Sequence, residues 1–181
     1  MIGFQAEDIM SLFFFRRDVF AIQYDGGAYK PVYRSITIKD IQEHLLGNVT
    51  LGAYCIKDNM IRWACIDIDG KEDGSENEKL LENAEDIYRL FPDFLRMLEF
   101  SGRRGYHVWI FFDEPVTALY GKTLVKSRLN TVGMNKFEVF PKQVVLSQKG
   151  FGNLVKIPLA KHKVTGKFSK ILKFEDKQKL F

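Results

Sequence analysis

The chain has little of what marks a secreted, cysteine-stabilised or membrane-spanning protein. Only two of its 181 residues are cysteines, Cys55 and Cys65, and they do not form a Cys-x-x-Cys pair. We therefore expect neither a disulfide framework nor a cysteine-rich zinc site. No apolar run approaches the roughly 20 residues of a membrane-spanning helix, and the N-terminus has no signal-peptide pattern. We expect a cytoplasmic protein without membrane partners.

The composition predicts a single domain with a large core. Hydrophobic residues make up 46% of the chain, and phenylalanine alone occurs 16 times, which is ample for one domain of this length. The formal net charge is +4. Acidic residues dominate positions 67–86, whereas basic residues dominate from Lys122 onward. This distribution is compatible with a polyanionic partner.

Hydrophobic periodicity predicts an α+β fold with a mostly antiparallel sheet. Turn residues at Asp25-Gly26-Gly27 and Lys57-Asp58-Asn59 predict two hairpins, the second joining residues 49–56 to 61–68. We expect the charged tail, residues 170–181, to fray. Helices are expected at 6–17, 37–47, 75–90 and 117–130, and further strands at 19–24, 29–33, 94–100, 106–112, 137–140 and 154–159.

Two carboxylates follow a strongly apolar strand in Cys65-Ile66-Asp67-Ile68-Asp69-Gly70. Residues two apart in a strand share a face, so Asp67 and Asp69 should project side by side. Their mutual repulsion and partial burial favour a compensating cation, and Mg²⁺ or Mn²⁺ prefers oxygen ligands. The alternative is a pair of turn aspartates that cap a strand end.

A basic, glycine-containing loop lies between two strands in Ser101-Gly102-Arg103-Arg104-Gly105-Tyr106-His107. Glycine frees the backbone, and arginine presents planar forks that suit phosphate oxygens. Ser101, Arg103, Arg104 and His107 are therefore candidate triphosphate ligands. The alternative is an ordinary hairpin connection with a packing histidine.

Further candidates lie in the second half of the chain. Glu138 is a single carboxylate inside an apolar strand, so it should face a cation or the surface. Lys156 and His162 lie in a basic segment that is either an anion site or a solvated surface. Two-metal phosphoryl transfer needs carboxylates for the metals and cationic groups for the triphosphate, and these candidates supply both.

The motifs, in this order, resemble those of the archaeo-eukaryotic primases. Asp67-Ile68-Asp69 is similar to the family's first motif, and Ser101 to His107 is similar to its second, a loop that closes on histidine. Phe137-Glu138 resembles the third, although many members have Asp at this position. The segment 154–167 resembles the one whose Lys and His contact the incoming nucleotide, which corresponds to Lys156 and His162.

Finer features resemble the primase domains of TOTE conflict systems and of CRISPR-associated primase-polymerases. They are Val108-Trp109-Ile110-Phe111-Phe112 with Glu114-Pro115, and Phe140-Pro141-Lys142-Gln143. The resemblance implies an RRM-like catalytic module at about 61–170 beside an N-terminal α/β module at about 1–60, within one domain over 1–181. Ligands for the zinc module of cellular primases are lacking. One hypothesis is that the chain is a catalytic core excised from a longer protein.

The residues and the resemblance together predict a template-dependent DNA primase-polymerase that joins (deoxy)nucleoside triphosphates. Asp67, Asp69 and Glu138 would bind two Mg²⁺ or Mn²⁺ ions. We expect a monomer that binds nucleoside triphosphates and single-stranded or primer-template DNA. The resemblance implies helicase or CRISPR adaptation proteins as associates. The alternatives are a non-catalytic single-stranded nucleic-acid-binding module with a primase fold, and a metal-dependent nuclease or sugar-nucleotide transferase.

Overall fold

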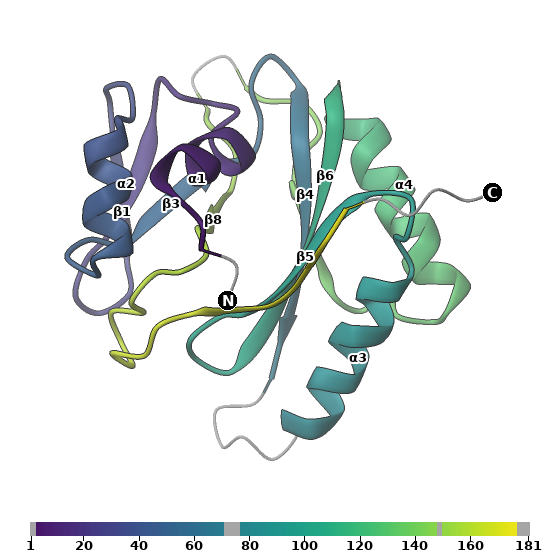
Figure 1. Ribbon diagram of the computed structural model, residues 1–181. Coiled ribbons are helices and arrows are strands. Elements are labelled where there is room, and N and C mark those ends of the chain that lie inside the picture. Colours follow the sequence, from purple (N-terminus) through teal and green to yellow (C-terminus); the bar gives the residue numbers. More distant parts are fainter. Residues whose placement is uncertain (1–2, 71–76, 148–149, 177–181) are drawn as a thin grey trace.

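The computed structural model describes residues 3–70, 77–147 and 150–176. Over these residues the chain forms four helices and two antiparallel sheets, one of four strands and one of five (Figure 1). The predicted α+β class with antiparallel pairing is confirmed. No helix in these ranges has the length and apolar character needed to cross a membrane.

The four-stranded sheet has the order β2-β1-β3-β8. Its strands are β1 (Phe20–Gln23), β2 (Tyr29–Val32), β3 (Leu51–Tyr54) and β8 (Leu154–Lys156). Helices α1 (Ala6–Phe13) and α2 (Ile38–Leu45) lie beside this sheet in Figure 1. Thr37 caps the N-terminus of α2, because its hydroxyl accepts a hydrogen bond from the Asp40 amide at 3.3 Å. The late strand β8 thus completes a sheet built from the start of the chain.

The five-stranded sheet has the order β7-β4-β6-β5-β9. Its strands are β4 (Met60–Asp69), β5 (Leu95–Phe100), β6 (Gly105–Thr117), β7 (Glu138–Phe140) and β9 (Lys170–Glu175). Helices α3 (Asn77–Arg89) and α4 (Ala118–Thr131) lie on one side of this sheet, and the four-stranded sheet with its helices lies on the other (Figure 1). Strand β4 lies between β7 and the central strand β6, and both β4 and β6 run through the middle of the molecule (Figure 1).

Aromatic side chains join the two halves into one core. The ring of Phe13 on α1 packs edge-to-face on Trp109 of β6, with centroids 4.9 Å apart. The indole Nε1 of Trp63 donates a hydrogen bond to the Phe13 carbonyl at 2.9 Å. All three side chains are fully buried. The two sheets are consequently held in a fixed relation by burial of large apolar surface.

Two expectations about strands are wrong. Residues 49–56 and 61–68 do not form a hairpin, because β3 pairs with β1 and β8 whereas β4 pairs with β6 and β7. Asp58 and Asn59 both have positive φ angles, and this tight turn passes the chain from one sheet to the other. The tail also does not fray entirely, because residues 170–175 form β9 at the sheet edge.

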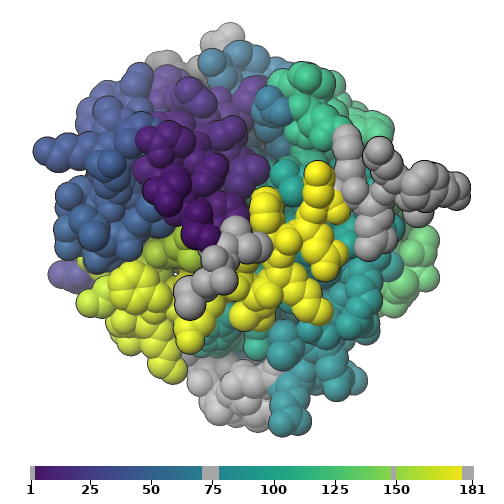
Figure 2. Space-filling model, in the orientation of Figure 1, coloured from purple at the N-terminus to yellow at the C-terminus, as the bar shows by residue number. Residues whose placement is uncertain are grey.

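The strand β9 lies on the surface beside the N-terminal segment, as the yellow and purple atoms of Figure 2 show. The rings of Phe4 and Phe174 meet at 5.1 Å between centroids. Edge-to-face contact of this kind adds to the packing of Ile171 and Phe174 against the core and stabilises this peripheral strand. The last residues, 177–181, lie outside the described part of the chain.

Candidate active site

The strand register places the acidic candidates on one face of the five-stranded sheet. Asp67 on β4 is the direct cross-strand partner of His107 on β6 and of Glu138 on β7. Opposed residues of an antiparallel pair point to the same face, and so do residues two apart in a strand. Asp67, Asp69, His107 and Glu138 therefore originate on the same face, at the end of β4.

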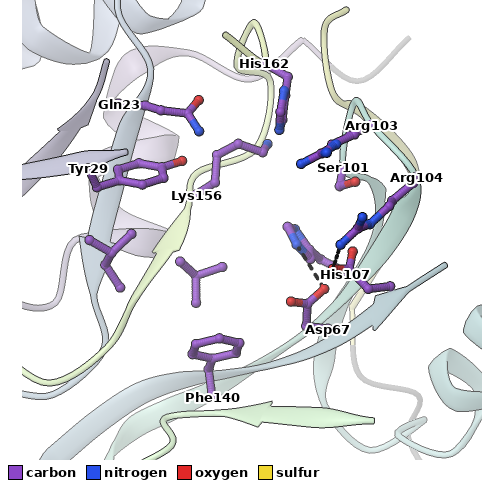
Figure 3. Close-up of a pocket in the computed structure, with 13 residues that line it drawn as sticks. Gln23, Tyr29, Asp67, Ser101, Arg103, Arg104, His107, Phe140, Lys156 and His162 are labelled. Atoms are coloured by element: carbon purple, nitrogen blue, oxygen red, sulfur yellow. Dashed lines mark hydrogen bonds and ion pairs between the residues drawn. The ribbon is translucent and has the colours of Figure 1, made fainter. Parts of the chain in front are cut away.

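A cleft of about 340 Å³ opens over this face, between the two sheets (Figure 3). Eight of the nine predicted site residues line it: Asp67, Asp69, Ser101, Arg103, Arg104, His107, Lys156 and His162. Glu138 is the exception. In Figure 3 the side chains from the four-stranded sheet face those of the second sheet across the cleft.

Each of the three carboxylates lies near a cationic side chain. The Oδ1 atom of Asp67 is 3.6 Å from Nε2 of His107. The Arg104 guanidinium donates a hydrogen bond to Asp69 at 3.3 Å. The Glu138 carboxylate lies 2.7 Å from Nζ of Lys142. The carboxylates thus share a face but point to three different partners.

Burial and neighbouring charge act in opposite directions at Asp67. Partial burial raises the pKa of its carboxyl group, His107 opposes this effect, and the negative charges of Asp69 and Glu138 add to it. The ionised form of Asp67 is therefore short of compensating positive charge. A site of this kind gains stability from a bound cation.

The carboxylate oxygens of Asp67 and Asp69 suit a hard divalent ion, so these side chains fit Mg²⁺ or Mn²⁺. Within the described residues, no three His, Cys, Asp or Glu side chains already gather closely enough to hold a metal. Glu138 would have to turn from Lys142 to join them. It is the cross-strand partner of Asp67, so its side chain starts from the same face of the sheet.

The basic loop between β5 and β6 is held against a second loop, residues 160–169. The Thr165 hydroxyl donates a hydrogen bond to the Gly102 carbonyl at 2.8 Å. Gly102 has a φ angle of +87°, and a Cβ atom there would lie 3.2 Å from the Lys167 carbonyl oxygen. Glycine is therefore required both for conformation and for this close approach.

This loop contact brings cationic groups from both sheets together. Burial lowers the pKa of His162, and the nearby charges of Lys156 and Arg103 lower it further. Among the described residues, the buried Nδ1 atom of His162 has no hydrogen-bond partner. An anion in the cleft would neutralise the mutual repulsion of these side chains. The chemistry of this end of the cleft suits a polyphosphate.

A buried glutamate that sequence analysis did not single out lies behind the cleft. Glu99 on β5 is fully buried, and its Oε2 atom accepts hydrogen bonds from His107 Nδ1 at 2.9 Å and from Trp109 Nε1 at 3.0 Å. Its Oε1 atom accepts one from Lys156 Nζ at 3.1 Å. The only sequence signal was a single charge within the apolar run of residues 97–100.

Charge pairing decides the ionisation of this cluster. Burial favours the neutral carboxyl group of Glu99, but the charges of Lys156 and His107 outweigh it and hold the pKa of Glu99 at about 2. Burial also opposes protonation of His107, yet Glu99 and Asp67 raise its pKa. The Glu99 carboxylate is therefore ionised at neutral pH, and Lys156 and His107 lie in contact with it.

The cleft also contains two residues of the N-terminal hairpin that the sequence did not mark. Gln23 and Tyr29 line its far end (Figure 3). The buried Tyr29 hydroxyl has no hydrogen-bond partner among the described residues, and burial raises its pKa. Their positions could not be inferred without knowing how β8 joins the first sheet.

Comparison with known proteins agrees with this arrangement. A family model of the archaeo-eukaryotic primase domain of the TOTE conflict system matches residues 28–179. This range is most of the chain and includes all nine predicted site residues. A comparison with curated proteins finds no match. The extent of the family match shows that this chain belongs to the archaeo-eukaryotic primase domains of TOTE conflict systems.

Proposed function

We propose that this domain is a template-dependent DNA primase-polymerase that joins (deoxy)nucleoside triphosphates by two-metal nucleotidyl transfer. The observation that carries the proposal is the single cleft in which strand-end carboxylates of one sheet meet cationic groups from both sheets. Family membership supports nucleotidyl transfer in general. The five-stranded sheet would be the RRM-like catalytic module.

Asp67, Asp69 and Glu138 would hold two divalent ions at the end of β4. Bound there, the ions would help to ionise a primer 3′-hydroxyl and would neutralise charge on the leaving pyrophosphate. The protein's own contribution at this end is orientation. His107, with Nδ1 held by Glu99 and Nε2 3.6 Å from Asp67, would attract the Asp67 carboxylate toward the cleft side.

The opposite end of the cleft would bind the triphosphate. Arg103 and Arg104 present planar donor groups, Lys156 adds charge from β8, and His162 adds charge from the second loop. Multiple cationic donors on non-bridging oxygens position the α-phosphate for in-line attack and stabilise the charge of the transition state. The Ser101 hydroxyl, at the start of the loop, would add a further donor.

The nucleic acid would approach over the basic second half of the chain, and phosphate contacts would make its binding fall steeply with salt. The family match names the TOTE conflict system and not CRISPR adaptation, so we propose a conflict system as the setting. Associated helicase activity would come from other domains or proteins. We propose that the domain itself acts as a monomer.

A second function is favoured by one observation. Asp69 and Glu138 form ion pairs with Arg104 and Lys142, so side chains of the protein already compensate their negative charge. The domain would then be a non-catalytic module that binds single-stranded nucleic acid on a primase fold.

The experiment that separates these functions uses a 5′-labelled primer on a longer template, with dNTPs or NTPs and Mg²⁺ or Mn²⁺. We expect longer products, and their loss in Asp67→Ala/Asp69→Ala. Asp86→Ala, on the exposed surface of α3, is the matched control. Shorter products would indicate a nuclease, and template binding without any product would support the binding module. Products formed without primer would establish primase activity.

A further inference from the structure

We propose that Glu99 is a positioning residue that holds the Lys156 ammonium of the four-stranded sheet in the cleft, opposite the carboxylates of the five-stranded sheet. The proposal rests on the proposed function, because it concerns the binding of a triphosphate in that cleft. Glu99 does not line the cleft itself and would act through Lys156.

The two oxygens of Glu99 have separate partners. Oε2 is held within the five-stranded sheet, by His107 at 2.9 Å and Trp109 at 3.0 Å. Both partners lie on β6, and His107 is the direct cross-strand neighbour of Glu99. Oε1 is thereby directed away from this sheet toward Lys156 on β8, at 3.1 Å. One carboxylate thus connects the two walls of the cleft.

Stability alone does not account for this arrangement. A buried ion pair gains little over apolar residues of the same volume, because both charges lose their hydration. The contact instead restrains the side chain of Lys156 to one position. Lysine has a long side chain with many rotamers, and fixing it before the ligand binds removes an entropic cost from binding. Lys156 is only 8% exposed, and among the described residues its ammonium has one acidic partner, Glu99, which keeps it at the cleft wall.

A purely electrostatic role predicts the opposite result for a Glu99 variant. Removing its negative charge makes the cleft more positive, which would strengthen the binding of a polyanion. A positioning role predicts weaker binding in spite of the added positive charge, because Lys156 is released. The sign of the change in affinity therefore distinguishes the two roles.

The test measures binding of inorganic triphosphate without metal or nucleic acid, by isothermal titration calorimetry, for wild type and Glu99→Gln. Glutamine preserves the shape of the side chain. We expect about tenfold weaker binding, which is the lower end of the loss seen when a residue that orients a metal-binding side chain is removed. Glu114→Gln, at the exposed far end of β6, should bind like wild type. Equal or tighter binding by Glu99→Gln would overturn the proposal.

A second pair of variants covers the case in which Glu99→Gln does not fold. Both Lys156→Met and Glu99→Gln/Lys156→Met remove the ammonium. The double variant also removes the negative charge of Glu99, which Lys156→Met leaves without its ammonium partner. If Glu99 acts through Lys156, Lys156→Met should bind triphosphate more weakly than wild type, and the double variant should bind at least as tightly as Lys156→Met, because removal of the Glu99 charge then has no positioning cost. Binding of Lys156→Met at wild-type affinity, or a further large loss in the double variant, would contradict the proposal.

The same variants give a kinetic readout that a merely structural residue would not produce. In nucleotide incorporation, Glu99→Gln should raise KM for the nucleotide about tenfold and change kcat much less. An effect on kcat alone would contradict positioning of the triphosphate. The two proposals can fail separately. If Glu99→Gln binds triphosphate more weakly but the wild type extends no primer, the proposed function is refuted and this inference stands.

Discussion

Asp67 on β4 and Glu138 on β7 are direct cross-strand partners, yet the Glu138 carboxylate lies 2.7 Å from Nζ of Lys142 instead of meeting Asp67. Lys142 is four residues further along the chain, beyond the end of β7. A divalent ion and Lys142 would therefore compete for the same carboxylate. This competition makes Lys142 a modulator of metal affinity in the proposed mechanism.

Replacement of Lys142 by glutamine should lower the Mn²⁺ concentration needed for half-maximal incorporation. Both side chains of the pair are about half exposed, so solvent screens the interaction and the expected gain is small, about two- to fivefold. A titration of activity against Mn²⁺ measures it. Lys126→Gln on the exposed face of α4 is the control, and an unchanged or higher Mn²⁺ requirement in Lys142→Gln would count against the competition.

Asp67→Asn should stabilise the fold and abolish activity. Burial raises the pKa of Asp67, so its ionised form opposes folding at pH 7, and the neutral amide should add about 1 kcal/mol to the free energy of unfolding. Loss of a metal ligand should reduce incorporation at least about 100-fold.

Urea unfolding at several pH values tests the stability part of this prediction. Because the folded pKa of Asp67 lies above its unfolded value of 3.8, both states are protonated below that pH. The advantage of Asp67→Asn should therefore vanish as the pH approaches 4. An advantage that persists at low pH would show that ionisation is not its cause.

Gly105→Ala should displace the end of β4. An added Cβ would lie 2.5 Å from the Ile68 carbonyl oxygen and 2.8 Å from Oδ1 of Asp69, and the backbone must move to relieve contacts this short. We expect a loss of about 1–3 kcal/mol in unfolding free energy and a marked loss of incorporation. Gly3→Ala, where a Cβ meets nothing within 4 Å, is the control. Wild-type activity in Gly105→Ala would mean that Asp69 tolerates displacement.

His44 should make folding stability depend on pH between about 6.5 and 4. Its Nδ1 accepts a hydrogen bond from the Leu51 amide at 3.0 Å, and Nε2 lies 2.9 Å from the Pro158 carbonyl oxygen. The ring is therefore neutral, and burial lowers its pKa from 6.5 to about 4. As the pH falls through this window, the unfolded chain binds a proton that the folded chain does not. Up to about 3 kcal/mol of stability should be lost.

The measurement is the free energy of unfolding against pH for wild type and His44→Asn. The amide replaces the imidazole without titrating, so the curve of the variant should be flatter between pH 6.5 and 4. Parallel curves would show that His44 does not remain neutral in the folded protein.

Local features of the fold followed from the sequence because their causes are local. The β4 strand ends in Asp67 and Asp69 as its apolar pattern predicted, and the loop 101–105 connects two strands as its glycines indicated. The α2 boundaries followed from Thr37 and from Gly47, which has a φ angle of +81°. Helix caps and turns depend on residues within a few positions of one another.

The rest depended on contacts between distant segments. Strand β8 pairs with β3 across about 100 residues, and no local pattern encodes such a partner. Glu99 could not be recognised as buried, because Lys156 reaches it from 57 residues away. The lysine-rich β9 has a weak strand signal and depends on β5 for its backbone partners. Where a strand lies in a sheet is set by tertiary packing.

The most direct test of the account is the identity of the nucleotide that the domain adds. Four primer-templates that differ only in the first templating base would be offered each nucleotide singly, in Mn²⁺, with wild type and Asp67→Asn. The account predicts addition of the complementary nucleotide on each template and no addition by Asp67→Asn. Bound template with no addition, or addition that ignores the templating base, would contradict it.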